Sequence, residues 1–100
     1  MKTLINVLAI IVTLNCSAYC HSGNPTASGV MPQIGMCAVD KINGRWVPFG
    51  TIVKINGLGV LKVTDRFGDG RNNSVDIFME SYNKCIEFGR QDREAEVIMP

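Results

Sequence analysis

Hydrophobic residues are concentrated at the start of the chain. Ten of the first fourteen residues are hydrophobic, and Lys2 stands before the apolar run. A positive charge followed by about 7–15 apolar residues is typical of a secretory signal peptide, whereas a membrane-spanning helix needs about 20. We therefore expect residues 1–18 to form a signal peptide or an uncleaved leader, with cleavage near Ala18. The alternative is that the run is a buried strand or helix.

After residue 18 the chain divides into short hydrophobic stretches separated by turn residues. Asn43-Gly44 and Asn56-Gly57 stand between such stretches, and Asn-Gly pairs in this setting favour tight hairpin turns, of type I′ at Asn43-Gly44. Residues 19–100 therefore resemble a single domain made mainly of short strands. The strands that we expect cover residues 36–40, 51–55, 59–64, 74–79 and 94–99.

The segments between the expected strands are loops and one helix. Residues 20–34 and 65–73 are rich in glycine and short polar side chains, which predicts loops. Residues 81–88 have room for two helical turns, with Ser81 as the N-cap and Gly89 as the stop. Many short strands with one short helix predict a mainly β fold, a small closed β-barrel.

Composition and charge narrow the function classes. The chain has 100 residues, 46% of them hydrophobic, and a formal net charge of +1. This is one domain rather than two, and the composition excludes a disordered chain. The absence of a basic excess argues against a nucleic-acid partner. Four cysteines and a single histidine argue against a Cys/His zinc site, and we expect no metal and no organic cofactor.

The cysteines are an even set in a chain that we expect to be exported. Disulfides are therefore expected, with three pairings open if all four cysteines survive processing. A domain of this size buries little surface and benefits from cross-links. If the leader is cleaved after the first cysteine, one thiol is left over. The candidates are Cys16, Cys20, Cys37 and Cys85.

Three acids stand out because they end or interrupt apolar stretches. Asp40 follows Cys-Ala-Val, Asp65 follows Lys-Val-Thr, and Asp76 lies inside Ser-Val-Asp-Ile-Phe. A carboxylate in such a stretch must be paired or functional, because burying it without compensation is costly. Three of them can form one acid site, or each can hold a loop by accepting backbone N–H bonds. His21 lies in a polar loop and is interpreted as a surface residue.

The order of short motifs resembles the three-aspartate (3D) domain of bacterial cell-wall proteins, which also forms the C-terminal end of one type of murein lytic transglycosylase. The resemblance covers roughly residues 17–100. It rests on these pieces, in order: Ser17-Ala18-Tyr19, Thr26-Ala27-Ser28-Gly29, Ala38-Val39-Asp40, Val47-Pro48-Phe49-Gly50-Thr51, Val63-Thr64-Asp65, Val75-Asp76-Ile77-Phe78 and Phe88-Gly89-Arg90.

The resemblance implies a six-stranded double-psi β-barrel, the fold of rare lipoprotein A, barwin-like proteins and expansins. It implies that the three aspartates are Asp40, Asp65 and Asp76, with Asp76 as the general acid, Asp65 as the second acid and Asp40 in a supporting role. The loop after Asp65 departs from the family pattern and is closer to the rare lipoprotein A branch. The stretch between Asp40 and Pro48 is longer than the family pattern and adds Trp46.

The function that follows from the resemblance is cleavage of peptidoglycan. Asp76 would protonate the β-1,4 bond between N-acetylmuramic acid and N-acetylglucosamine, in a lytic or a hydrolytic route. Arg66, Arg71, Asn73 and Trp46 are candidate substrate-binding residues. The expected protein is a monomer that is secreted, periplasmic or bound to the cell envelope, and touches a membrane only through an uncleaved leader. The alternative is a non-catalytic carbohydrate-binding barrel of the expansin kind.

Overall fold

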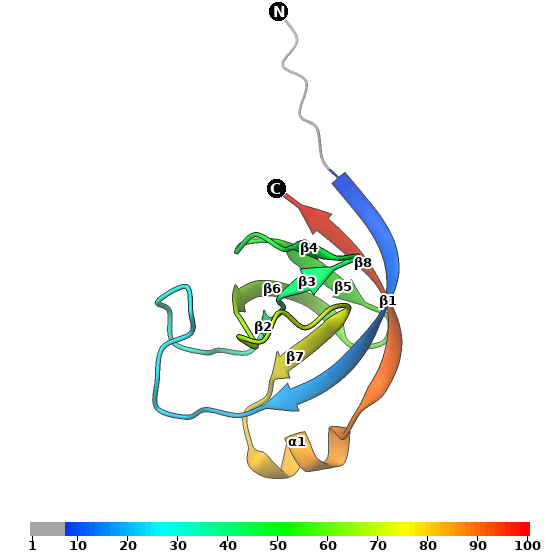
Figure 1. Cartoon of the computed structure of the whole chain (residues 1–100). Coiled ribbons are helices and arrows are strands. Elements are labelled where there is room, and N and C mark those ends of the chain that lie inside the picture. The colour runs from blue at the N-terminus through cyan, green and yellow to red at the C-terminus, as the bar shows by residue number, and fades with distance from the viewer. Residues whose placement is uncertain (1–7) are drawn as a thin grey trace, which may run out of the picture.

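A closed barrel of six strands forms the body of the molecule (Figure 1). The computed structural model describes residues 8–100. Around the barrel the strands follow the order β1, β7, β2, β6, β5, β8. Their bounds are β1 Leu8–Tyr19, β2 Met36–Ala38, β5 Ile52–Ile55, β6 Gly59–Asp65, β7 Ser74–Phe78 and β8 Gln91–Met99. Within the described residues the fold is therefore mainly β, which confirms the expected fold class of a six-stranded barrel.

The barrel mixes parallel and antiparallel pairing. Strand β1 runs parallel to β7, and β2 runs parallel to β6. The other four contacts are antiparallel: β2 with β7, β5 with β6, β5 with β8, and β1 with β8. Neighbours in the sheet are thus often distant in sequence, so that β1 and β8 join the two ends of the described chain.

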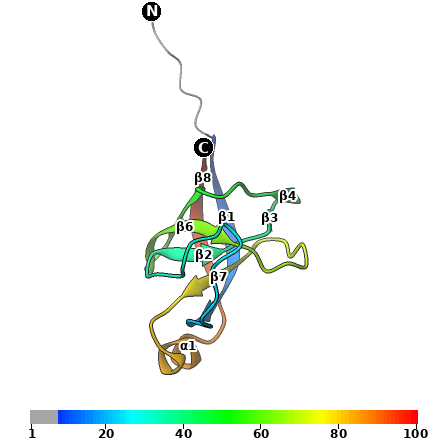
Figure 2. The same ribbon diagram turned by 90° about the vertical axis from the view of Figure 1, so that its left-hand side faces the viewer.

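The expected hairpins form where the Asn-Gly pairs stand. Asn43 and Gly44 both have positive φ, 50° and 78°, which is the type I′ geometry. They connect β3 (Lys41–Ile42) to β4 (Arg45–Trp46), a small hairpin outside the barrel. Asn56-Gly57 lies in the turn between β5 and β6. Figure 2 shows the β3–β4 hairpin and the loop before β7 on the same side of the barrel.

The helix also lies where the sequence predicts it. Helix α1 (Tyr82–Phe88) begins after Ser81, whose Oγ accepts a hydrogen bond from the backbone N–H of Lys84 at 3.2 Å. It ends at Gly89, whose positive φ of 63° favours glycine. No residue of α1 is buried, so the helix sits on the outside of the barrel. In the described part of the chain, no helix is long and apolar enough to cross a membrane.

The apolar run at the start of the chain forms the longest strand of the barrel. From Ile10 to Cys16 the even-numbered residues turn inward: Leu14 and Cys16 are fully buried, and Ile10 and Val12 pack against the core. Ile11, between them, is 62% exposed. β1 pairs with β7 on one side and β8 on the other. Residues 8–19 thus form a buried strand, which is the alternative to a signal peptide that the sequence left open.

The predicted signal peptide therefore overlaps a barrel strand. Its residues 1–7 lie outside the described residues, and its export role stays a prediction. Cleavage near Ala18 would remove nearly all of β1 and leave β7 and β8 with unpaired edges. The same residues cannot both be cut away and close this barrel. Truncation after Ala18 consequently tests which of the two roles these residues have.

Candidate functional site

Asp76 and Asp65 occupy matching positions on two strands of the barrel, β7 and β6, that are separated by β2. Across the sheet Ser17 of β1 lies opposite Asp76 of β7, and Asp76 lies opposite Ala38 of β2. Ala38 in turn lies opposite Asp65 of β6. One row across four strands therefore carries a serine, two aspartates and a small alanine between them. Residues opposite each other in a sheet share a face, so their side chains project to the same side.

This row lies on the outer face of the barrel. The residues on either side of Asp76, Val75 and Ile77, are buried in the core, so alternation turns Asp76 outward. Asp65 reaches the same face through an irregularity. Cys37 pairs with Val63 but the next residue, Ala38, pairs with Asp65, so β6 contains one extra residue at this point. Such a bulge re-aims the side chain that follows it.

Asp76 is the acid of the site that favours its protonated form. Its Oδ1 accepts a hydrogen bond from the Ser17 hydroxyl at 2.9 Å. Burial raises the pKa of Asp76 above the ordinary aspartate value, and the charge of Asp65 acts in the same direction. The Ser17 hydrogen bond and the charges of Arg71 and Arg90 lower the pKa but do not cancel the rise. Asp76 therefore combines partial access to solvent with a proton held more tightly than usual.

Asp65 ties a loop to the rim of the same face. Its Oδ1 accepts hydrogen bonds from the backbone N–H groups of Ala27 and Arg66, both at 2.8 Å. The loop around Ala27 is also joined to β6 by a bond from the Ser28 N–H to the Thr64 carbonyl, 3.1 Å long. Asp65 thus fixes one wall of the site.

Tyr19 is a member of the site that sequence reasoning missed. Its ring packs edge-on against Phe78 with centroids 5.6 Å apart. Burial, together with the charges of Asp65 and Asp76, raises the pKa of Tyr19 well above its ordinary value. Its hydroxyl is buried and has no hydrogen-bond partner among the described residues. Tyr19 lies two residues after Ser17 on the same strand, so strict alternation along residues 17–19 was the signal that could have found it.

Asp40 is not in this row. It is fully buried and accepts hydrogen bonds from backbone N–H groups of the following loop, from Phe67 at 2.8 Å and from Gly70 at 2.8 Å, with longer ones from Gly68 and Arg71. Burial alone would raise the pKa of Asp40, but these donors outweigh it and the pKa lies below the ordinary value. Asp40 is therefore a charged anchor for the loop that carries Arg71.

Arg66 and Asn73 are engaged inside the protein. The two terminal nitrogens of Arg66 donate to the carbonyls of Val39 and Val47, at 2.8 and 2.6 Å. Its guanidinium lies over the ring of Phe49, 4.2 Å from the centroid. Asn73 accepts the N–H of Asn43 through its side-chain oxygen at 2.8 Å. These contacts hold the β3–β4 hairpin and its neighbouring loops, and substrate binding by Arg66 and Asn73 stays a prediction.

Arg71 and Trp46 remain available at the surface. Arg71 forms a 3.0 Å ion pair with Asp69 and lies over the Phe67 ring, 4.7 Å from the centroid. Trp46 is 56% exposed, and the Lys41 ammonium lies 5.2 Å from its ring centroid. The positive charges of Arg71 and Arg90 lower the pKa of Asp76. Arg90 belongs to one of the seven motifs but was not among the expected site residues.

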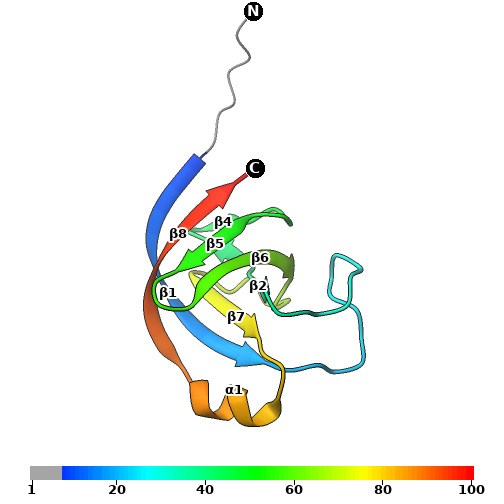
Figure 3. The ribbon, with the colours of Figure 1, turned by 180° about the vertical axis from the view of Figure 1, so that it is seen from behind.

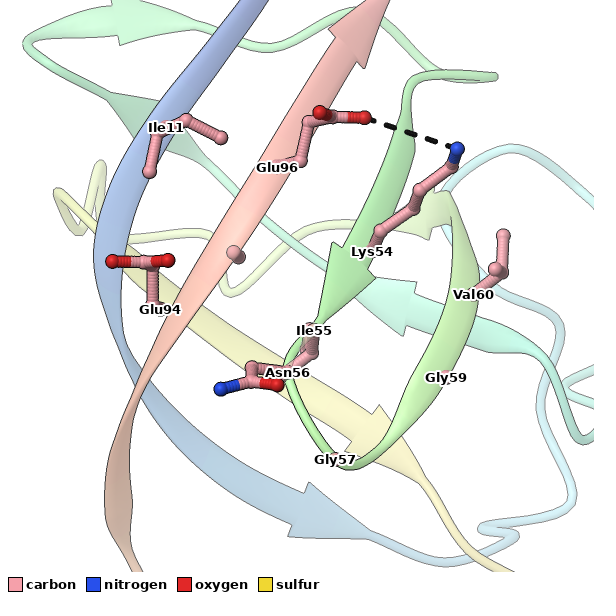
Figure 4. A pocket seen from close by; sticks show the side chains of 10 residues that line it. Ile11, Lys54, Ile55, Asn56, Gly57, Gly59, Val60, Glu94 and Glu96 are labelled. Carbon is pink, nitrogen blue, oxygen red and sulfur yellow. Dashed lines mark ion pairs between the residues drawn. The ribbon is translucent and has the colours of Figure 1, made fainter.

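Two of the hollows in the described surface are considered as binding sites, and neither is lined by a residue of this row. A hollow of about 490 Å³ opens over β5 and β8, between Ile11, Val60 and the Lys54–Glu96 ion pair of 3.8 Å (Figure 4). It contains none of the three aspartates. A second hollow, of about 350 Å³, is lined by Ser28, Phe49 and Thr64 among others. Thr64 immediately precedes Asp65 in the chain, but neither Asp65 nor Asp76 lines this second hollow.

The remaining candidates lie apart from the site or in the core. His21 is exposed, and its Nδ1 accepts the Gly23 N–H at 2.7 Å, which agrees with a surface role. The four cysteines are free thiols in the structure, so the expected disulfides are not seen. Cys16 and Cys37 are buried, and burial raises the pKa of Cys37 to about 12. Within residues 8–100, no three His, Cys, Asp or Glu side chains are placed to hold a metal ion.

Comparison with known proteins leaves the family open. No family of known proteins matches the sequence, and no curated protein matches it either.

Proposed function

We propose that this barrel is a three-aspartate domain that cleaves the β-1,4 bond between N-acetylmuramic acid and N-acetylglucosamine in peptidoglycan, with Asp76 as the general acid. The observation that carries the proposal is the row formed by Ser17, Asp76, Ala38 and Asp65 on the outer face. It sets an aspartate with a raised pKa beside a second carboxylate. A pair of acids whose environments differ in this way is typical of glycosidic acid catalysis.

The family assignment is supported by motif order and by the barrel. Seven short motifs follow one another as in the three-aspartate domain, and the closed six-stranded barrel of mixed strands is compatible with a double-psi fold. The two aspartates expected to act together share a face. Asp40, for which the family leaves a supporting role, accepts backbone hydrogen bonds from the loop before β7.

Cleavage of the glycosidic bond requires that the enzyme donate one proton to the leaving oxygen and then accept one from the attacking hydroxyl or water. Cleavage passes through an oxocarbenium-like state, and the leaving oxygen must receive a proton as the bond breaks. Protonated Asp76 supplies it. In the lytic route the Asp76 carboxylate then accepts the proton of the muramic 6-hydroxyl, whose oxygen closes a 1,6-anhydro ring. In the hydrolytic route Asp65 holds a water that attacks instead. Neither route requires a metal or an organic cofactor.

Substrate contacts follow from the groups around the row. Arg71 and Arg90 bring positive charge near Asp76, which suits carboxylates of the muramic acid and its stem peptide. The hollow beside Thr64 and Ser28 has room for part of a sugar. Trp46 is proposed to lie against the apolar face of another sugar.

A second candidate is a barrel that binds glycan without cutting it. Exposed aromatic side chains favour this candidate, because Trp46 is 56% and Phe49 40% exposed on neighbouring parts of the surface. In both cases the partner is peptidoglycan, the protein acts as a monomer, and the place of action is outside the cytoplasm or at the cell envelope.

The proposal is tested by incubating the full chain with purified peptidoglycan. We expect soluble glycan fragments to be released over time, and mass spectrometry to find 1,6-anhydro ends for the lytic route or reducing ends for hydrolysis. Binding of the protein to the wall with no fragment above the level of a no-enzyme control would reject the enzyme and favour the binding barrel.

A further inference from the structure

Two of the four cysteines lie next to each other outside the barrel. Cys20 directly follows β1, and Cys85 is in the middle of α1. The helix packs against β1 and lies below its end in Figures 1 and 3. The N–H of Met79, just before the helix, donates to the Tyr19 carbonyl at 2.8 Å, which fixes this junction. The Cys20 side chain is close enough to the Cys85 thiol to raise its pKa.

We propose that Cys20 and Cys85 form a disulfide that fastens α1 to the end of β1, and that Cys16 and Cys37 remain reduced in the core. The juxtaposition of the two thiols carries this inference. It concerns the cross-link alone and stands whether or not the barrel cleaves glycan.

Three of the other five pairs are excluded by the barrel. Cys16 and Cys37 are on β1 and β2, which are separated by β7. Adjacent strands are about 4.8 Å apart, so these two Cα atoms exceed the roughly 7 Å that a disulfide allows. Cys16 and Cys20 are four residues apart along extended chain, about 13 Å. Cys37 is fully enclosed in the core, whereas α1 has no buried residue, so Cys37 cannot reach Cys85.

The oxidation is a thiol–disulfide exchange with a small disulfide such as oxidised glutathione. One cysteine thiolate attacks the glutathione disulfide, forms a mixed disulfide and releases one glutathione thiolate. The second cysteine then attacks the protein sulfur of the mixed disulfide and releases the other glutathione. Two protein thiols are oxidised, and the two electrons and two protons end on two reduced glutathiones. Burial and the nearby Cys20 raise the pKa of Cys85, so the exchange should accelerate as pH rises.

The cross-link would fasten a short helix that lies on the outside of the barrel. No residue of α1 is fully buried, and Phe88 is the residue of α1 that packs against the core. The bond closes a long loop from the end of β1 to the helix, and long loops gain most from closure. The charge of Asp76 also acts on the Cys85 thiol, so the cross-link would lie near the acid site and fix the element beside it.

The experiment uses the reduced full chain, equilibrated with excess oxidised glutathione, then alkylated, digested and analysed by mass spectrometry. We expect a loss of two hydrogens, one cross-linked peptide pair joining Cys20 to Cys85, and alkylation of Cys16 and Cys37 only after unfolding. Oxidation should raise the Tm by roughly 10 °C, and reductant should reverse the rise.

Cys85→Ser provides the control. In this variant Cys20 should keep a bound glutathione, and oxidation should leave the Tm unchanged. The inference is overturned if the unmodified chain keeps glutathione on Cys20 or Cys85 without an internal bond. It is equally overturned if the cross-link involves Cys16 or Cys37, or if Cys85→Ser shows the same rise in Tm.

Discussion

Asp76→Asn is expected to lower the release of glycan fragments from peptidoglycan by at least about 100-fold, because general acid catalysis typically contributes 10²–10⁴-fold. An amide has the shape of the carboxyl group but cannot deliver its proton. The Ser17 hydroxyl, which now donates to Asp76 Oδ1 at 2.9 Å, can donate to an amide oxygen as well. The variant should therefore fold and bind the wall while its initial rate collapses.

Glu94→Gln is the matched control. It also exchanges a carboxylate of the barrel for an amide, but Glu94 is exposed and lines the hollow over β5 and β8 that holds none of the three aspartates (Figure 4). We expect its rate to equal that of the unmodified protein. A folded Asp76→Asn protein that releases fragments at the normal rate would show that the proton comes from another group.

Asp40→Asn should behave differently from Asp76→Asn. Asp40 is buried under backbone N–H donors from the 67–71 loop, and an amide nitrogen facing those donors would leave several of them unpaired. Each unpaired buried donor costs about 1–3 kcal/mol. Its effect should therefore appear first as a lower Tm. This contrast separates the aspartate that holds the loop from the one proposed to transfer the proton.

A chain that begins at residue 19 is expected not to fold. Removing residues 1–18 deletes two fully buried side chains, Leu14 and Cys16, and two that pack against the core, Ile10 and Val12. Full burial of one such aliphatic side chain contributes about 1.5–3 kcal/mol. The strand also supplies the backbone partners of β7 and β8. A domain of this size has a total stability of only about 5–15 kcal/mol.

Circular dichroism and thermal melting of the truncated chain test this. We expect no cooperative transition, whereas a chain that starts at Leu8 should melt like the full chain, because it keeps the whole of β1. If the chain from residue 19 melts cooperatively, then β1 is dispensable and residues 1–18 are free to act as a cleaved leader.

Local signals in the sequence predicted much of the barrel. Asn43-Gly44 and Asn56-Gly57 mark their hairpins because few residues tolerate the required backbone, and Ser81 and Gly89 bound the helix by capping it. Residues 8–19 were harder. A run that is apolar at both odd and even positions, such as Ile10-Ile11-Val12, looks the same in a leader and in a barrel strand. Only the pairing with β7 and β8 distinguishes them.

The sequence predicted the two aspartates of the candidate site but not the backbone and side-chain contacts around them. Asp65 and Asp76 stood out because each interrupts or ends an apolar stretch. The bulge that brings Asp65 opposite Ala38 depends on tertiary pairing, which no local pattern records. Arg66 looked like a substrate ligand because it lies in a loop beside an acid. Its partners are the backbone carbonyls of Val39 and Val47. Every residue has a backbone carbonyl, so the residue types in the sequence do not reveal which ones accept a hydrogen bond.

The most direct measurement of the proposed role of Asp76 is the rate of glycan cleavage against pH for the unmodified chain, Ser17→Ala and Ser17→Thr. A general acid works only while protonated, so the rate should fall as pH rises through the pKa of Asp76. The Ser17 hydrogen bond lowers that pKa. Ser17→Ala should therefore move the alkaline limb to higher pH, and Ser17→Thr, which keeps a hydroxyl, should restore it. An alkaline limb that stays in place in Ser17→Ala, or the absence of cleavage at every pH, would contradict the assignment of Asp76 as the acid.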